Sequence, residues 1–155
     1  MITDELDRSI LNILQTDGRI SSAELARRVN LSPPAVHARL KRMEASGLIG
    51  QYAAIVDRQQ AGYDLLCFVS VSLQLHHLDR VTGFRDAVRQ MPEVLECHHV
   101  TGEYDYLLKV VARNTEGLED FLLNRLTPIP GIACIHTSLV LREVKQTTAI
   151  PLHPF

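Results

Sequence analysis

The stretch LARRVNLSPPAVHARLKRME, residues 25–44, carries apolar residues at helical spacing that two adjacent prolines interrupt. Proline inside a helix removes a hydrogen bond and clashes with the preceding turn. In the first turn, however, backbone N–H groups have no partner within the helix, so a proline costs little there. Ser32 is a good N-cap, which places Pro33 at the first helical position. The prolines therefore predict the start of a helix that runs to about Ser46 and ends at Gly47.

Two further helices precede this one in the N-terminal third of the chain. Ser21 and Glu24 have the spacing of a capping box, which predicts a short second helix that Asn30, a residue tolerant of positive φ, brings to its end. The first helix is expected to begin near Thr3 as its N-cap and to present one apolar face. A short helix, a tight turn and a third helix with a basic outer face indicate a helix-turn-helix.

The third helix is the predicted recognition helix. Its apolar stripe consists of Val36, Leu40 and Met43, and a rotation of 100° per residue places a second set of residues away from it. We expect base edges to face Pro34, His37, Ala38 and Lys41. We expect the DNA backbone to face Arg27, Arg28, Arg39 and Arg42, with Ser32 at the helix start completing the DNA-binding set.

Local charge supports this interpretation, although the net charge of −2 alone does not. The five basic residues of the range 27–42 have no acidic residue among them. A local positive surface is what contact with phosphates requires. A three-helix docking module with a solvated charged face remains the alternative.

The composition of the whole chain is that of a globular protein. It has 155 residues, of which 46% are hydrophobic and 22% are charged, enough for one domain or two small ones. The three cysteines lie far apart without a CxxC pair, which favours reduced thiols and a cytoplasmic location. The acidic N-terminus does not resemble a signal peptide, and no apolar run is long enough to span a membrane.

The pattern changes after residue 50. We assign residues 1–50 to the helix-turn-helix domain, residues 51–64 to a linker and residues 65–155 to a second domain. The linker is expected to hold an extended strand over 49–56 and a turn over 57–62. In the second domain the order of predicted elements is β-α-β-β-α-β, which indicates a ferredoxin-like sandwich in an α+β protein.

One face of the predicted sheet is expected to lie outside the domain's own core. The first strand turns Phe68, Ser70, Ser72 and Gln74 to the face that the helices do not cover. This face is too mixed for a core and too apolar for plain solvent. A partner subunit is the economical explanation, so the sequence predicts a homodimer.

No arrangement of residues typical of an enzyme is present. The sequence has no nucleophile elbow, P-loop or GxGxxG motif, so we expect no catalytic residues and no cofactor. Consecutive histidines such as His98 and His99 point to opposite faces of a strand and cannot chelate together. A metal shared by His98 and His136 remains only as an alternative, and no metal site is predicted.

The segment TGEYD, residues 101–105, is a candidate ligand site. Gly102 allows positive φ, and Glu103 and Asp105 place two carboxylates at one hairpin. Exposed backbone N–H groups can hold a carboxylate and an acidic side chain can hold an ammonium, which are the two ends of a free amino acid. From the residues alone, a hairpin turn with solvated charges is the simpler interpretation.

The assembled pattern resembles the Lrp/AsnC, or feast/famine, family of bacterial and archaeal transcription regulators over nearly the whole chain. The resemblance is carried by LDRSILNILQTDGRISSAELARRVNLSPPAVHARLKRMEASGLI (6–49), GEYDYLLKV (102–110) and HTSLVLREVKQTTAIPL (136–152). The sequence departs from the family pattern at Asn30, where the family often has glycine. Because asparagine also adopts positive φ, the resemblance is little affected.

The resemblance implies a winged helix-turn-helix followed by a ferredoxin-like domain, in a protein that binds double-stranded DNA and responds to an amino-acid effector. It implies dimers formed through the sheets, which often assemble into octamers, and an effector bound between adjacent dimers. The implied effector-binding residues are Thr101, Gly102, Glu103, Tyr104, Asp105, Thr137 and Ser138.

Two other functions remain open at this point. Some relatives of the family are haem-biosynthesis decarboxylases that bind a tetrapyrrole, and His98, His99 and His136 are compatible with that role. The other alternative is a DNA-organising protein that has no effector.

Overall fold

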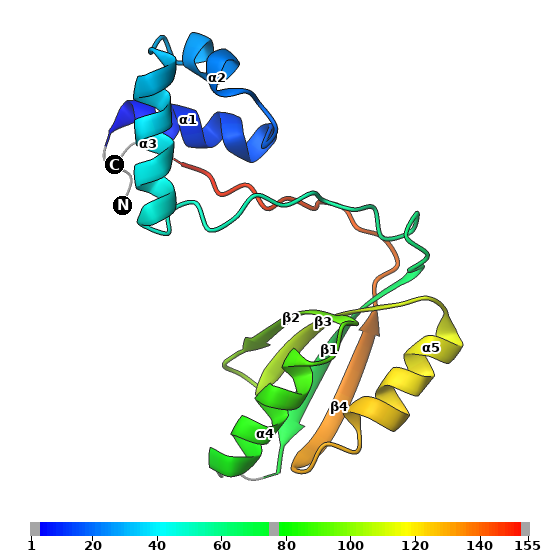
Figure 1. The fold of residues 1–155 in the computed structure, drawn as a ribbon. Helices are drawn as coiled ribbons and strands as arrows, with labels where there is room; N and C mark the ends of the chain where they lie inside the picture. Colours follow the sequence, from blue (N-terminus) through cyan, green and yellow to red (C-terminus); the bar gives the residue numbers. More distant parts are fainter. Residues whose placement is uncertain (1–3, 75–77, 153–155) are drawn as a thin grey trace. The chain divides into compact units, whose positions relative to one another are not determined.

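The computed structural model describes residues 4–74 and 78–152, which form two compact units (Figure 1). The described parts of Met1–Ile55 and Lys145–Phe155 make the first unit, and Val56–Val144 makes the second. No helix in the described chain is both long enough and apolar enough to cross a membrane.

Residues 145–152 belong to the first unit, whereas the sequence boundaries 65–155 place them in the second domain. The amide side chain of Gln15 donates to the carbonyl oxygen of Ile150 at 3.0 Å and accepts from its backbone N–H at 2.6 Å. Leu152 packs against the apolar core of the same unit. Pairing of this kind joins residues far apart in the chain and has no local sequence signal.

The first unit contains the three expected helices. They are α1 (Glu5–Thr16), α2 (Ser22–Arg28) and α3 (Pro33–Ala45). Their buried faces form one core, to which α1 contributes Ile10, α2 contributes Leu25 and α3 contributes Val36.

Local capping explains where these helices begin and end. The hydroxyl of Ser32 accepts from the backbone N–H of Ala35, with prolines at the first two helical positions, as predicted. Asn30 adopts φ 55° in the turn and Gly47 adopts φ 74° after α3, which glycine does at no steric cost. The expected cap Thr3 lies outside the described residues, and the side chain of Asp4 caps α1.

The linker differs from the sequence prediction in one respect. Residues 49–56 form no strand, because their backbone has no neighbouring strand that completes a hydrogen-bonded ladder. The turn that follows is present: the carboxylate of Asp57 accepts from the backbone N–H of Gln60, and its carbonyl accepts from Ala61.

The second unit has the predicted β-α-β-β-α-β order. Its elements are β1 (Leu65–Leu73), α4 (Leu78–Arg89), β2 (Val94–His99), β3 (Tyr106–Ala112), α5 (Thr115–Asp120), η1 (Phe121–Leu126) and β4 (Ile132–Leu139). The strands pair antiparallel in the order β2-β3-β1-β4, the ferredoxin-like arrangement. A π-helix, η1, continues α5, and the sequence did not predict it.

Only one face of this sheet is covered by the unit's own helices. Val69 and Val71 of β1 are fully buried and share a core with Phe84 of α4 and Phe121 of η1. On the other face Phe68 keeps 39% of its surface exposed. The alternation predicted for β1 is confirmed. We call the face that carries Phe68, Ser70 and Ser72 the open face, because the described helices of this unit do not cover it.

Candidate functional site

The outer face of α3 presents the residues predicted to contact DNA bases. Val36 and Met43 are buried, while a second set of side chains on the same helix is exposed. The exposed set includes Ser32, Pro34, His37, Ala38, Lys41 and Arg42, together with Pro33, Glu44 and Ala45. The helix is therefore anchored on one side and free on the other, as major-groove recognition requires.

The arginines of α3 have partners inside the protein that the sequence analysis missed. Arg39 donates from Nη1 to Asp4 Oδ2 and to Asp7 Oδ1, both at 2.7 Å. Arg42 donates from Nη2 to Asp7 Oδ2 at 2.5 Å. Asp7 is fully buried, whereas the Arg42 side chain remains 51% exposed. The backbone-contact role predicted for these two arginines therefore competes with an existing ion-pair network.

Arg27 and Arg28 are also paired. Both donate to Glu24, at 2.7 Å and 2.9 Å from its Oε1. The hydrogen bonds from Arg27 and then Arg28 lower the pKa of Glu24 to about 2. Glu24 therefore stays charged at any pH used for a binding assay. Among the residues that the structure describes, Lys41 pairs with no acid and is the free cation of α3.

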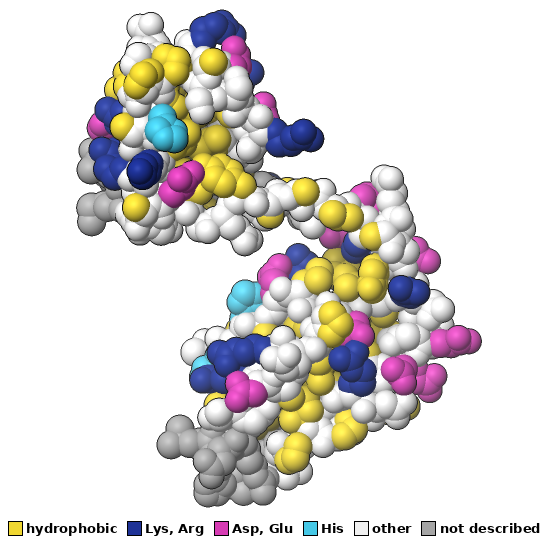
Figure 2. All heavy atoms as spheres, viewed as in Figure 1, with side chains coloured by type: hydrophobic (Ala, Val, Ile, Leu, Met, Phe, Trp, Pro, Cys, Tyr) yellow, Lys and Arg dark blue, Asp and Glu magenta, His cyan; other side chains and the backbone are white. Residues whose placement is uncertain are grey.

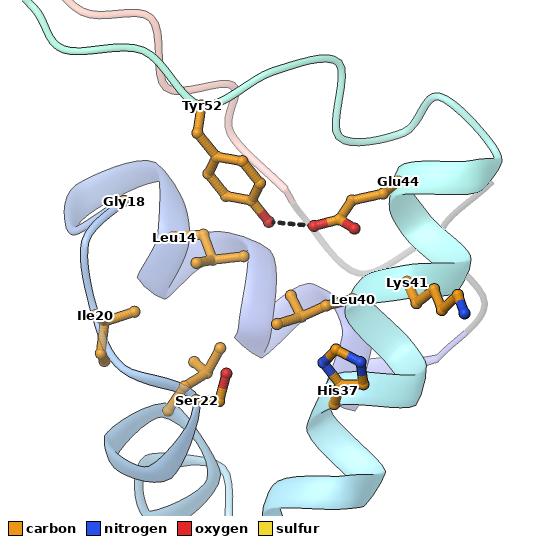
Figure 3. A pocket seen from close by; sticks show the side chains of 10 residues that line it. Leu14, Gly18, Ile20, Ser22, His37, Leu40, Lys41, Glu44 and Tyr52 are labelled. Atoms are coloured by element: carbon orange, nitrogen blue, oxygen red, sulfur yellow. Dashed lines mark hydrogen bonds between the residues drawn. The ribbon is translucent and has the colours of Figure 1, made fainter.

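A groove of about 290 Å³ lies beside the exposed face of α3 (Figure 3). Leu14, Ile20 and Leu40 form its apolar side, and His37 projects from α3 at its edge. The hydroxyl of Tyr52 donates to Glu44 at 3.0 Å, which ties the segment after α3 back onto that helix. Partial burial, and then this bond, raise the pKa of Tyr52 to about 12, so its hydroxyl stays protonated.

In the second unit, residues 101–105 join β2 to β3 as a hairpin whose shape Asp105 holds. The Asp105 carboxylate accepts from the backbone N–H of Leu73 at 2.8 Å, and the Asp105 N–H donates to the Val71 carbonyl at 3.0 Å. Gly102 adopts φ 127°, a conformation that favours glycine, as predicted. Asp105 therefore fastens the hairpin to the end of β1.

The hairpin tip carries groups that a small ligand can use. Within residues 4–74 and 78–152 no acceptor is found for the backbone N–H groups of Gly102, Glu103 and Tyr104. The Glu103 side chain is exposed, and the Tyr104 ring stacks against His136 of β4 at 6.1 Å between centroids. Free N–H donors beside an exposed carboxylate match the two charged ends of an amino acid.

Two residues of the implied effector set lie elsewhere along β4. The strand register aligns Tyr106, at the hairpin end of β3, with Val71 and then with Ile135. Thr137 and Ser138 are two and three residues further from the hairpin and point to opposite faces of the sheet. They follow His136, the residue of β4 on which Tyr104 of the hairpin stacks.

The strand register also separates the histidines that were considered for a metal or tetrapyrrole. His98 aligns with Leu107, Leu107 with Ser70, and Ser70 with His136, so the two histidines stand at opposite edges of the sheet. Three strand spacings amount to about 14 Å, too far for one metal ion. His99 is on the other face, stacked on Tyr106. No metal-ligating cluster is found among the described residues.

Some of the missed partners carry a signal that spacing reveals. Glu24 precedes Arg27 and Arg28 by three and four residues, the separation at which helical side chains meet. Asp7 shares the buried face of α1 with Ile10, and a buried acid needs a cationic partner. The charge count over residues 27–42 missed both acids because they lie before that window.

Comparison with known proteins gives matches over the whole described fold. A family model of the winged helix-turn-helix DNA-binding domain matches residues 3–49, and a model of the Lrp/AsnC ligand binding domain matches residues 66–150. The leucine-responsive regulatory protein of Escherichia coli K12 is 39% identical over 147 residues, which cover 95% of this chain and 90% of that protein.

Solved structures agree with these matches. A transcriptional regulator from Neisseria meningitidis, solved as a complex with L-methionine, has a TM-score of 0.93 and 38% identity, with 96% of both chains covered. A feast or famine regulatory protein from Mycobacterium tuberculosis, also complexed with L-methionine, has a TM-score of 0.86 and 28% identity. The alignment covers 95% of this chain and 97% of that one.

Proposed function

Because the chain belongs to the Lrp/AsnC family of transcriptional regulators, we propose that it binds double-stranded DNA through α3 and responds to a free amino acid bound at the 101–105 hairpin. The observation that carries the DNA-binding role is the outer face of α3, where His37, Ala38 and Lys41 are exposed. The L-methionine complexes of two related regulators, and the name of the leucine-responsive regulatory protein, support an amino acid as the effector class.

Lys41→Ala tests the recognition helix. Lys41 is exposed and pairs with no acid in the described chain, so its removal leaves the fold intact. If Lys41 contacts a guanine edge, we expect a loss of about 1–3 kcal/mol on the preferred DNA sequence, confined to particular base pairs. Fluorescence anisotropy with a selected duplex and a scrambled duplex measures both affinities.

The matched control is Lys145→Ala, which removes the same charge from an exposed position of the first unit outside the helices. It is expected to leave the preference for the selected duplex unchanged. Equal affinities of wild type and Lys41→Ala on the selected duplex contradict the assignment of α3 as the reading helix.

An amino-acid effector is supported by the hairpin, whose tip N–H groups have no acceptor in the described chain and flank the exposed Glu103. A ligand that binds only the folded state raises apparent stability by RT ln(1 + [L]/Kd). We expect at least one of the common L-amino acids to raise the melting temperature of the protein. Failure of all of them, with DNA binding intact, favours an effector-independent DNA-organising protein.

We further propose a homodimer formed through the open face of the sheet, with octamers as the larger assembly. The support is the partly exposed Phe68 on a sheet face that the helices described in the second unit leave uncovered. A dimer also matches the two half-sites that helix-turn-helix proteins read. Thr137 and Ser138 join the effector site only where copies of the chain meet.

The remaining expectations follow from the proposed role. The protein is proposed to regulate transcription without catalysing a reaction, and to act in the cytoplasm of a bacterial or archaeal cell, where the DNA lies. The tetrapyrrole alternative gains no support from His98 and His136, which lie at opposite sheet edges.

A further inference from the structure

We propose that Asp7, assisted by Asp4, limits non-specific DNA binding by holding Arg39 and Arg42 of the recognition helix in ion pairs. The inference rests on the DNA-binding role proposed for α3, and it adds a regulatory role for α1 that neither the helix-turn-helix pattern nor the effector site provides.

The geometry places one buried acid between two arginines. Each oxygen of Asp7 accepts from a different guanidinium, Oδ1 from Arg39 and Oδ2 from Arg42. Asp4 takes a second bond from Arg39 while it also caps α1. The backbone bond from Asp7, and then the Arg39 bond, lower the pKa of Asp4, which favours its charged form beside Arg39.

These ion pairs lower the net positive charge at the outer face of α3. Two aspartates and two arginines make a cluster of zero net charge, where the α3 sequence alone suggests two free cations. Arg27 and Arg28 likewise share Glu24. Figure 2 shows the result on the visible face of the first unit, where Lys and Arg side chains lie beside Asp and Glu side chains and do not form one continuous basic area.

Stability alone does not explain a charged residue at position 7. Asp7 is fully buried on the same face of α1 as Ile10. Removing a carboxylate from water is costly, and a buried ion pair is often no more stabilising than apolar residues of similar size. What an apolar residue at this position cannot do is neutralise Arg39 and Arg42.

Neutralising these arginines affects how well a DNA-binding protein discriminates its specific site from other DNA. Contacts to phosphates supply essentially all of the non-specific affinity, with no information about sequence. A regulator must find its site among a vast excess of other DNA, so the ratio of specific to non-specific affinity decides its occupancy. Withholding two guanidinium groups from phosphates lowers the non-specific affinity and leaves base contacts from Lys41 in place.

Asp7→Asn tests the proposal. Asparagine keeps the shape and one acceptor oxygen but presents an NH₂ group to the other guanidinium, which is thereby released. Each additional phosphate contact steepens the slope of log Kd against log salt by about 0.9. We therefore expect the loss of affinity for a random-sequence duplex between 50 and 200 mM salt to grow about 3.5-fold per released guanidinium. The ratio of specific to non-specific affinity should fall.

The matched control is Glu5→Gln, which changes the net charge of α1 by the same amount. Glu5 is exposed and pairs with Arg8 of its own helix. If only overall charge matters, the two variants shift the salt slope equally, and the proposal is overturned. Two double variants identify the released arginine: Asp7→Asn with Arg42→Gln, and Asp7→Asn with Arg39→Gln. The arginine whose removal restores the wild-type salt slope is the one that Asp7→Asn released.

Asp4→Asn covers the case in which Asp7→Asn does not fold. Asparagine is as good an N-cap as aspartate, and Asp4 is exposed, so this variant keeps α1. It is also expected to steepen the salt slope for the random duplex, by less than the roughly 0.9 that one phosphate contact contributes. An unchanged or shallower slope in the folded variants means that the aspartates position the arginines for DNA or only stabilise the fold, and overturns the proposal. Absence of DNA binding by the wild type overturns the role of α3 itself, a distinct result.

Discussion

Phe68→Asp is expected to abolish self-association of the protein. Phe68 lies on the open face of the sheet, on the central strand β1, where 39% of its surface is exposed in the single chain. In a dimer with two-fold symmetry the substitution occurs twice across one interface. Each copy loses about 2–3 kcal/mol of apolar burial and adds a carboxylate that must lose water. The dissociation constant should rise by roughly a thousandfold or more.

Sedimentation velocity at micromolar protein concentration measures this effect. Leu123→Asp is the matched control, because Leu123 is an exposed apolar residue of η1, away from the open face. It introduces the same charge and should leave the dimer intact. Phe68→Leu, which keeps an apolar side chain, should also remain dimeric. A wild-type protein that sediments as a stable monomer rules out the open face as an interface.

Much of the fold could be predicted because its determinants are local. The Ser32 hydroxyl and the prolines after it fix the start of α3 within four residues, and Asn30 and Gly47 set the turns on either side through their own φ angles. Alternation along β1 needs only the period of two that a strand imposes, and its buried positions lie where the sequence places them.

What could not be predicted depends on contacts between distant residues. The bonds from Arg39 and Arg42 to Asp7 join positions 32 and 35 residues apart, and those from Gln15 to Ile150 join positions 135 apart. No periodicity encodes these pairings, because they exist only after the helices have packed. For this reason the exposed face of α3 could be predicted from the sequence, whereas the pairing of its arginines with Asp7 could not.

The hairpin at residues 101–105 also combines a feature that the sequence predicted with one that it left open. Gly102 indicated the turn correctly through its conformational freedom. The role of Asp105 stayed ambiguous in the sequence, because a carboxylate beside a turn can bind an ammonium or brace the backbone. The bond it accepts from the Leu73 N–H shows that one oxygen braces the backbone. Glu103, exposed at the tip, becomes the better candidate for the ammonium.

Asp105→Ala is therefore expected to abolish the response of the protein to its amino-acid effector. The variant leaves the part-buried Leu73 N–H without its acceptor, at a cost of about 1–3 kcal/mol. The hairpin then no longer holds its N–H groups in one arrangement, and effector affinity should fall by at least about tenfold. Basal DNA affinity should stay close to that of the wild type, because α3 belongs to the other unit.

Calorimetric titration of the effector, with and without DNA, separates the two roles of Asp105. Asp105→Asn keeps an acceptor oxygen for Leu73 and loses only the charge. If Asp105 acts only by accepting this backbone bond, the response of the variant to effector should be nearly normal. Glu103→Gln should instead weaken effector binding while the hairpin stays ordered.

Because coupling between two binding sites is reciprocal, DNA must change effector affinity in the wild type by the factor by which effector changes DNA affinity. An Asp105→Ala protein that keeps this coupling shows that Asp105 neither shapes nor contacts the site. A response lost equally in Asp105→Asn assigns the ammonium to Asp105 and not to Glu103.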